Sequence, residues 1–376
     1  MHSTVFFEEL TSHLNLQLPF VVYRKPEQST VRALLQETSE EHHVNNFTEQ
    51  GFVFAPFDDT SPALLFPLEL SKSLETKYTK SMNRVEKVSK YSNDKTTSEK
   101  ENHIQLVTKG VNEIRLGELE KVVLSRYDCV GVSEENPIQI FKSLLDTYPS
   151  AFVYCWFHPH VGLWLGATPE SLLKVENNRF STMALAGTQL YQDNLNVHWE
   201  EKEKHEQEVV TTAIVESLEG KIETLVISKS ETVKAGNLLH LRTQISGTLP
   251  TMERVIDIAA LVKAIHPTPA VCGFPKEAAK RFILQNENYN REFYTGYLGE
   301  LNFQEIKKRN VNRRNVENRA YTSVKRVSDL YVNLRCMKVN GNQAFIFVGG
   351  GITKDSNAEA EWEETVNKTQ TMKNVL

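Results

Sequence analysis

The sequence predicts an α+β protein with antiparallel sheet, and three observations support this class. Short apolar runs typical of strands occur at 122–124, 152–157, 162–167, 180–185, 330–339 and 343–348. An Asn-Gly pair, Asn340 and Gly341, stands between the last two runs and is a strong hairpin signal. Helices predicted at 202–218, 254–265 and 358–371 do not alternate regularly with these strands, so hairpins are favoured over parallel βαβ units.

Each predicted element has a local justification. The last two strands are expected to join through residues 340–342 in a type I′ turn, because both central residues of that turn need positive φ. The second helix is expected to stop at Pro267 and Pro269, because proline and the residue before it both disfavour helical backbone. The first and third helices carry apolar residues, such as Val210 and Trp362, that would dock them on a core.

Composition excludes several classes of protein. The 376 residues carry a formal net charge of −5, which argues against bulk binding to nucleic acid or to an anionic membrane. The four cysteines are far apart with no C-x-x-C pair, which fits a reducing compartment and excludes a zinc ribbon. We find neither a leader-like N-terminus nor an apolar run of membrane-spanning length. The expectation is a cytoplasmic protein, with a monomer as the default.

Two polar stretches organise the chain. Residues 77–102 read as a loop or a solvated helix, so we expect residues 1–105 to form an N-terminal part and 106–376 the catalytic region. Residues 307–326 hold eight basic residues against one glutamate, Glu317. A nucleic-acid patch would explain this charge, but a surface insertion between two strands is preferred because the stretch has few aromatic residues for base stacking.

Two acidic pairs on predicted helices are the most informative candidates for chemistry. Glu203 and Glu206 are three residues apart and share a helical face, as do Glu361 and Glu364, with Lys368 one turn beyond. Either pair alone is more often a solvated face. A glycine run at 349–351 directly precedes the second helix, however, and would let a ligand approach the backbone. Carboxylates that converge from two helices suit Mg²⁺, which prefers oxygen ligands.

Further candidates come from single polar residues at strand ends or within strands. Lys121 heads an apolar strand, where a lysine usually extends to solvent but can act as a general base if held in a pocket. Glu170 follows a proline turn and is either a turn residue or a general acid whose pKa is raised by partial burial. Thr188 could present a hydroxyl, and Arg335 is expected on one face of an alternating strand, where a carboxylate ligand would explain its charge. His266, taken alone, is more often structural.

Nine runs together resemble the chorismate-utilising enzyme family, which includes isochorismate, salicylate, anthranilate and aminodeoxychorismate synthases. They occur in family order from about residue 120 to the end, whereas the first hundred residues contribute little. The runs are KVVLSR (121–126), GATPESLL (166–173), LAGT (185–188), KEKHEQEVV (202–210), HLRTQISG (240–247), AIHPTPAVCGFP (264–275), REFYTGYLGELNF (291–303), LYVNLRCM (330–337) and GGGITKDSNAEAEWEETVNK (349–368).

The resemblance implies a single large domain of two packed antiparallel sheets flanked by helices, with Mg²⁺ as cofactor and chorismate as substrate. The implied metal ligands are Glu206 and Glu364, with Glu203 and Glu361 beside them, some acting through water. The implied substrate-binding residues are Thr188, His266, Tyr294, Arg335, Gly349, Gly351 and Lys368. Among these, Arg335 and Tyr294 would hold the enolpyruvyl carboxylate, while the metal would bind the ring carboxylate.

The resemblance also implies an acid and a base. Lys121 would take a proton from the water that attacks C2, and Glu170 would protonate the departing C4 hydroxyl on the opposite face. Family members that add ammonia typically have glutamine in place of Lys121, so the lysine indicates water as nucleophile and isochorismate as product.

Two alternatives stay open at this point. One is a salicylate synthase, which forms isochorismate and then eliminates pyruvate, although the run 264–275 resembles isochorismate synthases more. The other is a non-catalytic interaction protein that retains the scaffold. Whether the product feeds menaquinone or siderophore synthesis cannot be read from the residues.

Overall fold

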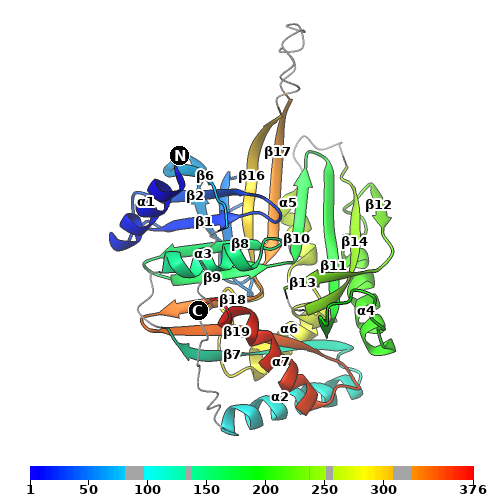
Figure 1. The fold of residues 1–376 in the computed structure, drawn as a ribbon. Helices are drawn as coiled ribbons and strands as arrows, with labels where there is room; N and C mark the ends of the chain where they lie inside the picture. Colours follow the sequence, from blue (N-terminus) through cyan, green and yellow to red (C-terminus); the bar gives the residue numbers. More distant parts are fainter. Residues whose placement is uncertain (81–96, 133–136, 237, 251–256, 308–322) are drawn as a thin grey trace.

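The computed structural model describes residues 1–80, 97–132, 137–236, 238–250, 257–307 and 323–376. Its strands form two antiparallel sheets of nine and ten strands (Figure 1). The α+β prediction with two antiparallel sheets is confirmed.

The first sheet, in spatial order, contains β15 (Gly273–Phe274), β7 (Lys121–Gly131), β19 (Gln343–Ile352), β18 (Cys336–Asn340), β9 (Gly162–Thr168), β8 (Phe152–His158), β1 (Phe20–Arg24), β2 (Thr30–Gln36) and β6 (Ser71–Lys77). The second contains β12 (Thr224–Ile227), β14 (Leu238–Thr248), β11 (Arg179–Leu190), β10 (Ser171–Glu176), β17 (Ser323–Val332), β16 (Tyr297–Lys307), β4 (Gly51–Ala55), β5 (Leu64–Pro67) and β3 (His42–His43), with β13 (Glu231–Ala235) on β14. The helices are α1 (Ser3–Asn15), α2 (Thr97–Arg115), α3 (Pro137–Thr147), α4 (Glu201–Leu218), α5 (Ile258–Ile265), α6 (Lys276–Asn286) and α7 (Ala358–Lys373), with a 3₁₀ turn at Leu68–Leu70.

Aromatic side chains join the two sheets. Phe152 of β8 stacks on Tyr331 of β17 with ring centroids 4.4 Å apart, and Phe54 of β4 stacks on Trp156 of β8 at 4.7 Å. All four rings are buried in one cluster that draws on both sheets. Large aromatic rings contribute much apolar area for each side chain, so this layer accounts for a substantial part of the burial that holds the sheets together.

A buried group of charges also crosses between the sheets. Glu300 of β16 is completely buried and forms ion pairs with Lys25 at 2.5 Å and Arg32 of β2 at 3.0 Å. Tyr23 donates a hydrogen bond to the same carboxylate at 2.6 Å. A buried carboxylate needs such partners, because an unpaired charge in the interior costs several kcal/mol, of the order of 3–5.

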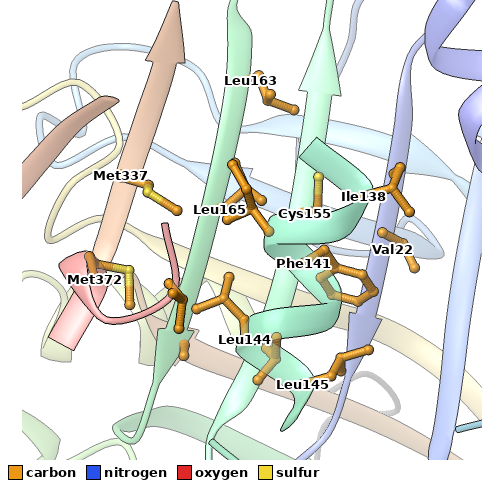
Figure 2. Packing of buried hydrophobic residues seen from close by; sticks show 14 of the residues in the cluster. Val22, Ile138, Phe141, Leu144, Leu145, Cys155, Leu163, Leu165, Met337 and Met372 are labelled. Carbon is orange, nitrogen blue, oxygen red and sulfur yellow. The ribbon is translucent and has the colours of Figure 1, made fainter. Parts of the chain in front are cut away.

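Helices cover the outer faces of both sheets. In Figure 2, α3 lies across β8 and β9, with the Phe141 ring on the side of Val22 and Met372 of α7 on the opposite side. The helix α7 packs on β19 and α2, whereas α4 packs on β11 and β14 of the other sheet. The helices that carry the two acidic pairs are therefore anchored on different sheets.

Most predicted elements are confirmed. Strands occupy the predicted runs from 122 to 185, and α4 and α7 match the predicted helices to within two residues. Asp257 caps α5 by accepting a hydrogen bond from the Ala260 N–H at 2.8 Å, so α5 begins after residue 257. Residues 254–256 of the predicted helix lie outside the described residues.

The predicted single strand at 330–339 is wrong. β17 ends at Val332 in the ten-stranded sheet, and β18 begins at Cys336 in the nine-stranded sheet. Arg335 lies in the connection between them with φ of +47°, outside any strand. The chain thus changes sheets at this point, and no glycine or proline marks the change.

The hairpin between β18 and β19 is confirmed, but its predicted turn type is not. Asn340 pairs with Gln343, so Gly341 and Asn342 are the central residues. Gly341 has φ of +57°, whereas Asn342 does not have positive φ. Positive φ at the first central position alone is the pattern of a type II′ turn, which also favours glycine there.

Parts of two further predicted segments lie outside the described residues. These are residues 81–96 of the polar stretch 77–102 and residues 308–322 of the basic stretch 307–326; the described end of the first stretch is the beginning of α2. Strands on both sides of residue 105 pair with each other, as β1 does with β8 and β4 with β16. The division of the chain into an N-terminal part, 1–105, and a catalytic region, 106–376, remains a prediction about function. In the part of the chain that can be assessed, no helix combines the length and apolar character needed to cross a membrane.

Candidate active site

A cavity of about 140 Å³ lies between the two sheets, bounded by α4 and α7. It brings together ten of the predicted site residues, from segments far apart in the sequence. They are Glu170, Thr188, Glu203, Glu206, Tyr294, Arg335, Gly349, Gly351, Glu364 and Lys368.

Lys121 reaches this cavity through Glu206. The lysine is 1% exposed at the start of β7, and its Nζ lies 2.8 Å from Glu206 Oε1. Burial acts to raise the pKa of Glu206, but Lys121, Lys368 and Lys202 outweigh it and the net pKa is lowered. Glu206 is therefore ionised at neutral pH and paired with a buried lysine.

The glycine run on β19 makes room for these groups. A methyl group on Gly351 would lie 2.5 Å from Glu206 Oε1 and 3.1 Å from Lys121 Cε. A methyl group on Gly350 would lie 3.3 Å from Glu361 Oε2. The bare backbone thus gives room to the acidic side chains themselves, and the approach of a ligand to it remains a prediction.

The other glutamates are also close to lysines. Lys202 lies 3.0 Å from Glu361, and Lys368 lies 2.6 Å from Glu364 and donates to the Gly349 carbonyl at 2.8 Å. Burial and then Glu364 raise the pKa of Glu361, which shows that the two carboxylates on α7 repel each other.

The donor set fits a hard divalent cation. It consists of carboxylate oxygens from two helices, and Glu203 Oε2 is buried at the cavity without a hydrogen-bond partner. Among the described residues, no three of these glutamates bring ligand oxygens within 4.8 Å of one another. The lysines neutralise the glutamates in this arrangement, and a cation there would compete with them for the same oxygens.

Glu170 is a buried carboxyl that also lines the cavity. It lies between β9 and β10, is 2% exposed, and its Oε1 has no hydrogen-bond partner. Burial raises its pKa to about 8, against the opposing effects of Lys121 and Arg335. The predicted rise in pKa is confirmed, and Glu170 is mostly protonated at neutral pH.

Arg335 is held by a residue to which the sequence analysis gave no role. His240 Nδ1 lies 2.8 Å from the Gly187 carbonyl, and its Nε2 lies 2.9 Å from Arg335 Nη2. Burial, then Arg335, lowers the pKa of His240 to about 3, so the ring is neutral. Since a carbonyl can only accept, Nδ1 carries the proton and Nε2 accepts from the guanidinium. The run 240–247 contained His240, but its alternation within a strand gave no further signal.

The remaining predicted residues, Thr188, Tyr294 and Gly349, also line the cavity. Thr188 Oγ1 lies 3.5 Å from His240 Nδ1, at the limit of hydrogen bonding. Tyr294 is buried, and its ring stacks on Phe347 with centroids 5.5 Å apart. The Tyr294 hydroxyl is 3.0 Å from the position of a methyl group on Gly349, so that glycine keeps the hydroxyl accessible.

His266 does not line this cavity, so its assignment to the substrate site is not supported. Its buried ring packs edge-on against Tyr297 with centroids 4.9 Å apart, in a different hollow beside Val44. Burial lowers the pKa of His266 to about 4, and the neutral ring acts as part of the core. The interpretation of this residue as structural agrees with the structure.

Comparison with known proteins assigns the family. The family model described as "Chorismate binding enzyme" matches residues 58–306, and a second model described as "chorismate binding enzyme" matches residues 320–374. Isochorismate synthase EntC of Escherichia coli (strain K12) is 30% identical over 284 residues, which are 72% of this chain and 66% of EntC. Anthranilate synthase component 1 of Aquifex aeolicus (strain VF5) is 26% identical over 312 residues, 80% of this chain and 58% of that protein.

A solved structure shows the same fold. MenF, the menaquinone-specific isochorismate synthase from Escherichia coli, superposes with a TM-score of 0.72 at 20% identity, covering 95% of this chain and 88% of that one. The matched region spans just under two thirds of the length of EntC, so these likenesses concern family and fold. On the family models and this shared fold, the chain belongs to the chorismate-binding enzyme family.

Proposed function

We propose that this protein is an isochorismate synthase, which converts chorismate to isochorismate by adding water at C2 and releasing the C4 hydroxyl. The observation that supports this most is that a buried lysine, Lys121, pairs with Glu206, which lines a cavity that also contains Glu170, a buried carboxyl whose pKa is raised. One base and one acid at the same cavity suit a reaction that takes up one hydroxyl and releases another.

The cationic side chains suit a substrate with two carboxylates. Arg335 is oriented by the neutral His240 and, with Tyr294, would bind the enolpyruvyl carboxylate. Burial lowers the pKa of Arg335 to about 10, which still leaves the guanidinium charged at neutral pH. The second carboxylate would lie toward α4 and α7.

Glu206 and Glu364 would hold Mg²⁺, with Glu203 and Glu361 beside it. The bound cation would neutralise the ring carboxylate of the substrate, which these glutamates would otherwise repel. Lys368 pairs with Glu364, and it would be available to bind substrate once a cation engages that carboxylate.

A product assay tests the activity. We expect the purified protein, mixed with chorismate and Mg²⁺, to give isochorismate as the product separated by chromatography. Salicylate with pyruvate would instead identify a salicylate synthase, and anthranilate formed with ammonium would identify an amine-adding enzyme. Unchanged chorismate would favour a non-catalytic interaction protein.

The metal site gives a second prediction. Replacing Glu364 by Gln should abolish Mg²⁺-dependent turnover, because it removes a charged ligand from a site that needs carboxylates. Mg²⁺ titration by calorimetry should show weakened binding, and circular dichroism should show an intact fold.

Glu363→Gln on the same helix is the matched control, because Glu363 is exposed and does not line the cavity. This variant should keep wild-type turnover and Mg²⁺ affinity. Full turnover in excess EDTA, or equal Mg²⁺ affinity in both variants, would contradict the proposed metal site.

A further inference from the structure

A second cluster of metal-binding side chains lies outside the cavity. One nitrogen of His158, one of His160 and a carboxylate oxygen of Glu41 lie within 4.8 Å of one another. In the described part of the chain, this is the one group of at least three His, Cys, Asp or Glu residues with that geometry. None of the three lines the candidate active site.

The cluster joins the two sheets. Glu41 directly precedes β3, the strand at one edge of the ten-stranded sheet. His158 ends β8 and His160 lies in the turn that leads to β9, both in the nine-stranded sheet. The three residues therefore meet because of the tertiary fold, since more than a hundred residues separate Glu41 from the histidines.

The nitrogen and oxygen atoms of the cluster lie as close together as the ligand atoms of a metal site must. His160 Nδ1 lies 3.1 Å from Glu41 Oε1, and the rings of His158 and His160 are 5.1 Å apart. His43 Nε2 lies 3.9 Å from the other oxygen of Glu41. Several nitrogen and oxygen donors thus surround a small volume at the surface.

His158 offers an unprotonated nitrogen beside His160. The residue is 3% exposed, and its Nδ1 accepts the His160 backbone N–H at 3.3 Å, a long hydrogen bond. Because an N–H can only donate, Nδ1 carries the lone pair of the neutral ring, and the proton lies on Nε2, near the Glu40 backbone carbonyl. An unprotonated imidazole nitrogen is the form that binds a metal ion.

We propose that Glu41, His158 and His160 bind a divalent transition-metal ion, with Zn²⁺ as the preferred ion, and that this ion links the edge of one sheet to the β8–β9 turn of the other. Two imidazoles and a carboxylate are a donor set that Zn²⁺ uses in proteins, with the fourth position open to water. Imidazole donors favour Zn²⁺ and its neighbours over Mg²⁺, whereas the glutamates of the cavity favour Mg²⁺. The two sites are therefore separable by metal type.

Zinc titration of the full-length chain tests the proposal. Protein stripped with EDTA and dialysed is titrated with ZnCl₂ in excess MgCl₂, which keeps the carboxylate site of the cavity occupied, and bound zinc is measured with a competing chelator dye. We expect one high-affinity Zn²⁺ per chain and a rise in melting temperature with Zn²⁺, because binding to the folded state stabilises it. Co²⁺ in place of Zn²⁺ should give the visible absorption of a low-coordinate site.

Three variants make the test specific. Glu41→Gln and His160→Gln change exposed side chains, so the metal-free proteins should melt as wild type, and each should bind Zn²⁺ at least about tenfold more weakly. His2→Gln changes another exposed histidine and should bind as wild type. Absence of high-affinity Zn²⁺ binding, or equal affinity in wild type and His160→Gln, would overturn the proposal.

Discussion

Replacing Glu170 by Gln is expected to lower the turnover of chorismate by about 10²- to 10⁴-fold, the usual contribution of a general acid. The amide has nearly the same shape but cannot give a proton to the departing hydroxyl. The binding constant for substrate should change little, because Glu170 is neutral in the wild type at pH 7. Steady-state kinetics on the purified variant, with the exposed Glu118→Gln as control, measures both effects.

The pH profile separates an acid from a residue that only shapes the pocket. Because burial raises the pKa of Glu170 to about 8, the protonated form dominates below that pH and is lost above it. Wild-type turnover should therefore fall as pH rises through about 8, and the residual activity of Glu170→Gln should lack this fall. A loss of only a few fold, with the alkaline fall retained, would leave Glu170 as a turn residue.

The burial of Glu170 also predicts that the Glu170→Gln variant, although less active, is more stable than the wild type at high pH. Between about pH 4.5 and 8, the folded protein keeps a proton on Glu170 that the unfolded chain releases. The wild type thus loses stability as pH rises through this range, and the glutamine variant does not. At about 1.4 kcal/mol per pKa unit, Glu170→Gln should gain up to a few kcal/mol over wild type at pH 8 and much less at pH 5. Thermal unfolding at the two pH values measures the difference.

The sequence predicted those parts of the fold that local signals specify. The place of the hairpin follows from the Asn-Gly signal, although its turn type differs from the predicted one, and α4 and α7 follow from helical periodicity combined with apolar anchors. These signals depend on residues within one turn or one strand. They are strong enough here to give element type and approximate limits before any tertiary contact is known.

The change of sheets at Arg335 could not be predicted in this way. The residues around it continue the strand-like pattern, and only pairing with partners distant in sequence decides that β17 and β18 enter different sheets. The role of His240 depends on the same event, because its ring meets Arg335 only after the chain has crossed between the sheets. Tertiary pairing overrides local preference in strands more readily than in helices.

The sequence predicted which residues form the candidate site, but not how their charged side chains pair or which of them are protonated. The sequence placed glutamates at helical spacing, yet the pairing of Lys121 with Glu206 and of Lys202 with Glu361 needs coordinates. A family resemblance gives positions, whereas the protonation of each group depends on burial and on neighbours contributed by other elements.

Replacing Lys121 by Gln is expected to abolish the addition of water, because the variant has no base beside the cavity. With high ammonium, a trace of amino product should appear, since ammonia needs no base to activate it. Chromatography of the products from chorismate and Mg²⁺, with and without ammonium, measures both. Lys121→Arg should not restore activity, because a guanidinium does not release its proton at working pH.

Mg²⁺ binding distinguishes a base from a structural partner of Glu206. Lys121 lies 2.8 Å from Glu206, so its removal leaves that buried carboxylate with one positive neighbour fewer. The metal-free variant should be less stable than wild type, since an unpaired buried charge is costly. Mg²⁺, which supplies positive charge at the same carboxylate, should then bind Lys121→Gln at least as tightly as wild type and recover part of the melting temperature.

Turnover and Mg²⁺ affinity, measured together, test whether Lys121 is the general base. If the lysine is the base, turnover is lost while Mg²⁺ affinity and the metal-bound fold are kept. If Lys121→Gln instead loses Mg²⁺ binding together with activity, the lysine acts by holding Glu206 in place. If the variant still forms isochorismate at near wild-type rate, both the base and the choice of water as nucleophile lose their support, because the distinction from ammonia-using relatives depends on this one side chain.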